Sequence, residues 1–298
     1  MFKPAVHRIL VPVTLDEEGI LSIRQAMCIR GKFYPRMTLL YVVPKKSFFF
    51  RLFRPMARRR YKKYSYENFY RFTADYFEGQ IPKFVKLKMR QGTLVRVLIF
   101  LIRCLKYDLV ILNKKLEQRD KMHSAWEAGI RLIVGEASCP VLTFNGSLCS
   151  RNINRIMVPV DIKRLHKHNV AWAIELALRF QAQIHLVSVL CANIETNKSY
   201  VYRKVRSMEE WIRKSGIPCK VTILREADKK LYQIIPDLIN REGPDMVIIM
   251  THQETILDIN YIGRLASEVI GKSEYPVFCI TPKKETLFSI LPKTFGYK

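Results

Sequence analysis

Residues 8–14 read RILVPVT, and the same pattern returns at residues 155–161 as RIMVPVD. Each copy is a short apolar run that is followed by an amphipathic helical stretch and then by a second apolar run. A repeat on this scale indicates a duplicated domain rather than a solenoid unit, because each copy is long enough to bury its own core.

The two halves also end alike. The closing motifs are DLVIL at residues 108–112 with CPVL at 139–142, and DMVII at 245–249 with YPVF at 275–278. With 298 residues, the chain fits two domains of ordinary size. We predict a first domain over 1–147 and a second over 148–298, joined by a segment rich in turn-forming residues.

Apolar runs and helical patterns alternate in both halves, which is typical of βαβ units and a parallel sheet. Strands are predicted near 8–13, 37–43, 83–89, 108–112 and 139–144, and near 155–160, 184–190, 219–225, 245–250 and 276–281. Helices are predicted near 17–30, 65–80, 92–106 and 121–136, and near 165–180, 199–215, 228–241 and 260–271. The fold class is therefore α/β, with a five-stranded parallel sheet in each domain and helices on both of its faces.

The net charge of +25 is the most unusual feature of the composition. Residues 1–147 contain 28 Lys and Arg against 11 Asp and Glu, whereas residues 148–298 contain 23 against 15. Between Glu18 and Glu67 there are 13 basic residues and no acidic one. A field of this kind attracts polyanions, which include nucleic acids, anionic lipids and acidic proteins.

The seven cysteines form no C-x-x-C pair, which favours reduced thiols in the cytoplasm over a disulfide framework or a zinc site. Cys139 fits a small packing residue better than a nucleophile. No signal peptide is predicted, and no apolar stretch reaches the roughly 18–20 residues that a membrane-spanning helix needs. The nearest, Leu94 to Leu105, contains Arg96 and Arg103. No hydrolase, zinc-protease or Walker-type motif occurs, so we expect no enzymatic activity.

The opening I-[LM]-V-P-V-[DT], the closing C-P-V or Y-P-V, and the order of elements resemble the universal stress protein family over nearly the whole chain. The resemblance implies a flavodoxin-like fold, a stress-related role and an internal pseudo-dimer of the two domains, with a homodimer as a further expectation. Many members bind ATP, through an acid at the end of strand one and a G-x-x-G-x9-G-[ST] motif after strand four. The glycines let backbone amides approach the phosphates at a helix N-terminus.

The second domain keeps fragments of this motif. Asp161, after Val160, stands at the acid position, and Met250, Thr251 and His252 occupy the place of the first glycines. Gly263 is retained, but Arg264 replaces the small hydroxyl residue. By resemblance these residues form the candidate adenine-nucleotide site. Two interpretations stay open: the site has lost its nucleotide, which we favour, or Arg264 replaces backbone donors and an adenine nucleotide such as ATP still binds.

The first domain departs further from the family pattern. Thr14 replaces the acid, LNKK at residues 112–115 replaces the first glycine pair, and Glu127 falls where the third glycine belongs. A carboxylate there would repel phosphates, so we expect no nucleotide in this domain.

The basic segment over residues 45–63 is the second strong feature and is predicted to lie in the loop after strand two. It has nine basic residues, no acidic one and four interleaved Phe. Its candidate contact residues for a polyanion or partner are Lys45, Lys46, Phe49, Arg51, Phe53, Arg54, Arg58, Arg59, Arg60, Lys62 and Lys63. This mixture suits an anionic membrane surface or an acidic protein, and less well a nucleic acid. Alternatively, its Phe residues pack on the protein while the charges stay solvated.

Two helical stretches of the first domain are unusual, one in its aromatic content and the other in its apolar character. Residues 64–72 read YSYENFYRF, and residues 94–105 have no clear polar face. A helix without a polar face is expected to be covered on both sides. The sequence therefore predicts a cytoplasmic, non-enzymatic regulatory or scaffolding protein with an interaction surface on its basic first domain. An adenine-nucleotide sensor and a binder of nucleic acids or membranes are the alternatives.

Overall fold

The computed structural model describes residues 4–44, 55–116, 123–146, 152–160, 167–190, 200–226, 230–251 and 262–281. The strands are β1 (Arg8–Val13), β2 (Arg36–Val43), β3 (Val85–Gln91), β4 (Leu109–Asn113), β5 (Val141–Phe144), β6 (Arg155–Pro159), β7 (Gln183–Leu190), β8 (Cys219–Arg225), β9 (Met246–Met250) and β10 (Val277–Ile280). The helices are α1 (Glu17–Phe33), α3 (Pro55–Tyr76), α4 (Leu94–Cys104), α5 (His123–Glu136), α6 (Lys167–Phe180), α7 (Tyr200–Lys214), α8 (Leu231–Glu242) and α9 (Arg264–Lys272).

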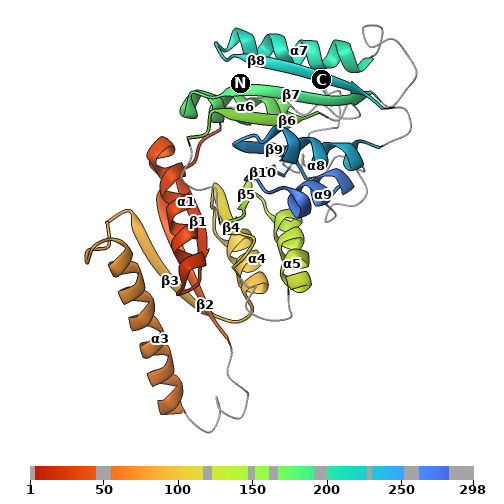
Figure 1. Ribbon diagram of the computed structural model, residues 1–298. Coiled ribbons are helices and arrows are strands. Elements are labelled where there is room, and N and C mark those ends of the chain that lie inside the picture. The colour runs from red at the N-terminus through yellow and green to blue at the C-terminus, as the bar shows by residue number, and fades with distance from the viewer. Residues whose placement is uncertain are drawn as a thin grey trace, which may run out of the picture.

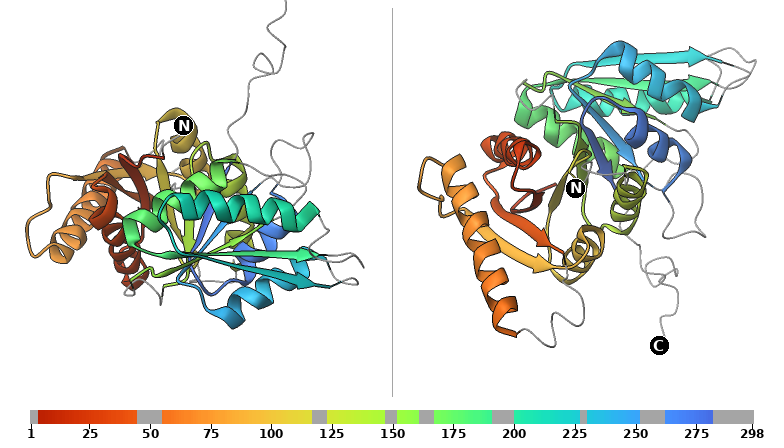
Figure 2. Two further views of the ribbon diagram at one scale, coloured as in Figure 1. Left: turned by 90° about the horizontal axis from the view of Figure 1, so that it is seen from above. Right: turned by 60° about the horizontal axis from the view of Figure 1, so that its bottom comes forward.

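The strands form one continuous sheet in the order β3-β2-β1-β4-β5-β10-β9-β6-β7-β8. Each half contributes five parallel strands, so the predicted fold class is confirmed. The halves meet where β5 and β10 pair antiparallel, with Phe278 opposite Leu142. Figure 1 shows the two halves on either side of this junction, and Figure 2 shows it from two further directions. The predicted pairing of the two domains within one chain is therefore present as a shared sheet.

Helices cover the sheet on both faces, as the nearly pure apolar strands require. One core contains Ile23 of α1, Phe69 of α3 and buried residues of α6 and α7. The other contains Leu98 of α4, Trp126 of α5 and buried residues of α8 and α9. The sheet is therefore a central layer between two helical layers that run across both halves.

The duplication extends to individual hydrogen bonds. In the first half, the Asp108 carboxylate accepts from the backbone N–H groups of His7 and Arg8, both at 2.9 Å. In the second half, the Asp245 carboxylate accepts from those of Asn154 and Arg155, at 2.9 and 2.8 Å. Each aspartate satisfies two amides at the start of the central strand, and thereby fixes the two strands relative to each other.

Reciprocal contacts join the two halves away from the sheet. The Lys32 ammonium lies 5.7 Å from the centre of the Phe180 ring, and the Arg179 guanidinium lies 5.3 Å from that of Phe33. Because both residues of α6 lie 147 positions after their counterparts in α1, this is one cation–aromatic contact made twice.

Two expectations for the first domain need correction. The basic segment is not a loop throughout, because α3 begins at Pro55 and so includes residues 55–63. Proline is favoured at the first helical position, where its missing N–H has no partner to lose. Helix α4 is not covered on both sides, since its Phe100 is 60% exposed. Among the described residues, no helix combines the length and apolar character needed to cross a bilayer.

Candidate functional site

The candidate nucleotide residues of the second half gather at the carboxyl edge of the sheet. Val160 follows β6, and its N–H donates to the carbonyl of Val187 at 2.7 Å. Thr251 follows β9 and is fully buried, with its N–H bonded to the carbonyl of Ile280 at 3.0 Å. Asp161 and His252 lie outside the described residues. The backbone N–H groups of Val160 and Thr251 are therefore already used within the protein.

The start of α9 lies against this edge. The Gly263 N–H donates to the carbonyl of Thr251 at 2.6 Å, and Gly263 is the N-cap of α9 without a side-chain cap. The Arg264 guanidinium lies 4.1 Å from the centre of the Tyr232 ring. Of the described candidates, Val160, Met250, Thr251 and Gly263 are buried and Arg264 alone is exposed. A nucleotide at these residues stays a prediction.

In the first half, Thr14 stands where the family pattern has an acid after strand one, and its surroundings are occupied by the chain itself. The Thr14 hydroxyl donates to the Asp16 carboxylate at 2.5 Å, and Asp16 accepts from the Gly19 N–H at 3.1 Å as the N-cap of α1. The backbone of Thr14 lies so close to Gly19 that a Cβ atom at Gly19 would overlap the Thr14 carbonyl. The beginning of α1 is therefore occupied by its own cap and by the end of β1.

Lys114 belongs to the segment 112–115 that replaces the first glycine pair of the family motif, and its side chain reaches into the second half. It follows β4, is 8% exposed, and donates from Nζ to the carbonyls of Ile270 and Ser273 at 3.0 and 2.6 Å. These carbonyls end α9, where a cation is favoured by the helix dipole and by the unpaired acceptors. Lys114 lies between positions 112 and 115, where the family pattern has its first two glycines, and its side chain joins the two halves.

Burial lowers the pKa of Lys114 to about 8, and the charges of Cys279, Glu127 and Glu274 oppose the shift. The neutral amine keeps two N–H donors, which is the number of carbonyls it serves. At the corresponding helix end of the first half, the Val134 carbonyl accepts from the Thr281 hydroxyl at 3.3 Å. Sequence patterns could not reveal Lys114, because its partners lie 156 and 159 residues away.

The basic segment is described only in part. Lys45, Lys46, Phe49, Arg51, Phe53, Arg54 and the side chain of Arg58 lie outside the described residues. Arg59, Arg60 and Lys63 are exposed on α3, and Lys62 is half-buried. Lys63 Nζ lies 3.8 Å from the Glu67 carboxylate one turn later. The structure therefore brings four of the predicted contact residues together on the first turns of one helix.

Cysteine and metal chemistry find no support in the described part of the chain. Cys28, Cys104, Cys139, Cys219 and Cys279 are free thiols there. Burial raises the pKa of Cys139 to about 12, so its thiol is protonated at neutral pH. No group of His, Cys, Asp and Glu in these residues could hold a metal ion.

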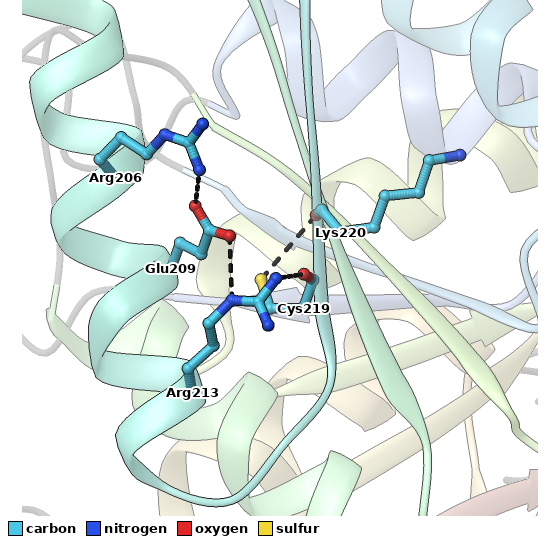
Figure 3. A network of polar contacts seen from close by, with 5 residues as sticks. All are labelled: Arg206, Glu209, Arg213, Cys219 and Lys220. Atoms are coloured by element: carbon cyan, nitrogen blue, oxygen red, sulfur yellow. Dashed lines mark hydrogen bonds and ion pairs between the residues drawn. The ribbon is translucent and has the colours of Figure 1, made fainter.

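The second half has a polar network on α7 that joins this helix to the edge strand (Figure 3). Glu209 accepts from Arg206 at 2.5 Å and from Arg213 at 3.0 Å, and Arg213 also donates to the Cys219 carbonyl at 2.6 Å. Burial raises the pKa of Glu209, but the hydrogen bonds from the two arginines outweigh this and lower it. The network fixes α7 on β8, and its sequence signal is the spacing of three and four residues.

A family model described as the universal stress protein family matches residues 152–281. This half of the chain belongs to the universal stress protein family. No curated protein matches the sequence. The family supports a stress-related role for the protein.

Solved structures show that the fold of the whole chain is shared. A universal stress protein of Archaeoglobus fulgidus is 15% identical, with a TM-score of 0.67, over 95% of this chain and 98% of that one. A functionally unknown protein of Pseudomonas aeruginosa is 18% identical, with a TM-score of 0.57, over 94% of both chains. The likeness therefore includes the first half, which lies outside the residues that the family model matches.

Proposed function

We propose that this tandem universal stress protein is a non-enzymatic interaction module of the cytoplasm, which binds an anionic partner through α3 of its first half. The carrying observation is the exposed side of α3. Met56, Tyr64, Tyr66 and Tyr70 are 78%, 64%, 43% and 50% exposed. The exposed cations Arg59, Arg60 and Lys63 lie between Met56 and the three tyrosines.

This combination fits the surface of an acidic protein or an anionic membrane. Apolar and aromatic side chains supply contact area, while cations next to them meet carboxylates or headgroups. Positions 56, 59 or 60, 63, 66 and 70 follow one another every three or four residues, so they form one stripe along the helix. The predominance of cations in residues 1–147 attracts such a partner over a longer range.

Charge reversal tests this proposal. Arg59→Glu with Arg60→Glu is expected to weaken binding to phosphatidylserine vesicles and to heparin at least about tenfold, because each cation near an anionic surface contributes about 1 kcal/mol. The matched control is Arg203→Glu with Lys214→Glu, which makes the same charge change at exposed positions of α7. Equal losses in both variants would mean that net charge alone drives binding, and no loss in either would reject the proposal.

An adenine-nucleotide site in the second half is the second candidate. It is favoured by the uncapped start of α9 beside exposed Arg264, since amides at a helix N-terminus attract phosphate. If ATP binds there, millimolar ATP raises the melting temperature, because a ligand at about 100 times its Kd adds about 2.7 kcal/mol of stability. Arg264→Ala is then expected to lose this shift, and Arg241→Ala at the exposed end of α8 to keep it. An unchanged melting temperature of the wild type rejects the candidate.

A further inference from the structure

Strand β3 places three cations on one face of the sheet. Its residues 86–90 read KLKMR, and successive side chains of a strand point to opposite faces. Leu87 packs with the core beneath α1 and α3. Lys86, Lys88 and Arg90 therefore lie on the opposite face, which they share with α4. Lys86 and Arg90 are exposed and Lys88 is half-buried.

The neighbouring strands extend this cluster. Arg36 of β2 lies two residues before Thr38, the partner of Lys86, and Arg36 itself pairs with Arg8 of β1. Alternate residues share a face, so both arginines lie on the side of Lys86. Both are exposed. The basic sheet face consists of Arg8, Arg36, Lys86, Lys88 and Arg90.

The duplication supplies an internal comparison. Met37 pairs with Val85 in the first half as Ile184 pairs with Cys219 in the second, which fixes the equivalent positions of the edge strands. Three of the five cations have uncharged counterparts there. These are Gln183 for Arg36, Thr222 for Lys88 and Leu224 for Arg90. The fold therefore does not need these three charges, and they are a property of the first half alone.

The cations of this face lie close enough to repel one another. Burial lowers the pKa of Lys88, and the positive charges of Arg90, Lys86 and Arg8 lower it further. In the described part of the chain, none of the five forms an ion pair with a carboxylate. Arg90 instead donates to the carbonyl of Met89, and Arg8 lies over the Tyr107 ring. A bound anion would remove this repulsion.

The shape of this face favours a single-stranded anionic polymer over a planar anionic membrane. Helix α4 stands on the same face of the sheet (Figure 1), and a helix is about 10 Å thick. A planar bilayer would meet α4 before it reached the cations on the strands. Alternate residues of a strand are about 6.6 Å apart, a spacing that the phosphates of a flexible single strand can follow. Arg96 and Phe100 are exposed on α4 and offer a further cation and a ring for base stacking.

We propose that the basic sheet face binds the phosphodiester backbone of single-stranded nucleic acid without sequence preference. This site goes beyond the proposed function, because it lies on the opposite side of the sheet from α3. A protein with both surfaces can hold an anionic partner and a nucleic acid strand at the same time.

The test replaces each extra cation by the residue that the second half has at the same position. The variant Arg36→Gln with Lys88→Thr and Arg90→Leu is compared with the wild type for binding a fluorescent oligo(dT) and oligo(U) of about 20 nucleotides, by anisotropy over a range of salt concentrations. Each lost contact with a single strand lowers the salt slope by about 0.7. We expect the slope to fall by about 2 and the Kd near physiological salt to weaken at least about tenfold.

Two further variants keep the test decisive. Arg203→Gln with Lys214→Gln and Arg241→Gln removes the same charge from exposed positions of α7 and α8 and should change the Kd less than about threefold. Lys88→Arg with Arg90→Lys keeps the charges and should bind like the wild type. The inference is overturned if the sheet variant binds as the wild type does, if the control variant on α7 and α8 shows an equal or larger loss, or if the wild type binds anionic vesicles but no oligonucleotide. The last outcome would leave the role of α3 intact.

Discussion

Gly19→Ala is expected to lower the free energy of unfolding by at least about 3 kcal/mol, measured by urea denaturation. A Cβ atom at Gly19 would overlap the Thr14 carbonyl oxygen and come within 2.9 Å of the Thr14 carbonyl carbon. Backbone atoms cannot swing aside as the end of a side chain can. Thr14 is also held from both sides, by β1 before it and by its hydrogen bond to Asp16 after it.

Gly31 in the same helix is the matched control, because a Cβ atom there would meet nothing within 4 Å. Gly31→Ala should leave stability unchanged or raise it by up to about 1 kcal/mol, since alanine loses less backbone entropy in a helix. If Gly19→Ala has the same free energy of unfolding as the wild type, the end of β1 does not lie over α1, and the position of the family's acid in the first half is open.

Lys114→Met should carry a stability deficit that increases with pH. The native state releases the Lys114 proton near pH 8, whereas the unfolded chain keeps it to about 10.5. Between these values the unfolded state binds more protons, so the wild type gains stability from this group as the pH rises. The deficit of the variant is therefore expected to grow by about 2 to 3 kcal/mol from pH 7 to pH 10.

Two opposing effects set the deficit at neutral pH. The variant leaves the carbonyls of Ile270 and Ser273 without their donor, at about 1–3 kcal/mol each, but it also removes the cost of a buried charge. Lys115→Met is the control, because it removes the same group from the neighbouring, exposed position. Parallel pH profiles for the two variants would contradict the contact between the halves.

Hydrophobic patterns were sufficient to predict the strands. The inner strands have helices on both faces and leave a nearly pure apolar signal, whereas the edge strands β3 and β8 alternate apolar and polar residues. The start of α3 was predicted ten residues late. Cations at the start of a helix oppose its dipole and resemble a solvated loop, and only Pro55 indicated a beginning there.

The sites were harder to predict than the elements. Fragments of the family motif supplied the candidate residues of the second half, but they gave no sign that four of the five described candidates are buried. The position of Lys114 against α9 depends on how the halves pair, which no local pattern contains. The basic sheet face had a signal that was available, because the alternation of Lys86, Lys88 and Arg90 follows the period of a strand.

The pairing of β5 with β10 has a consequence for how this protein responds to its own concentration. Two separate chains joined by the same contacts would dissociate below a certain concentration, whereas halves on one chain meet at an effective concentration in the millimolar range. The assembled form therefore persists however little protein the cell contains. A substitution in a symmetric dimer is also repeated in both subunits, but here each half can change alone. One half could thus gain, on the basic sheet face, three cations that the other half lacks.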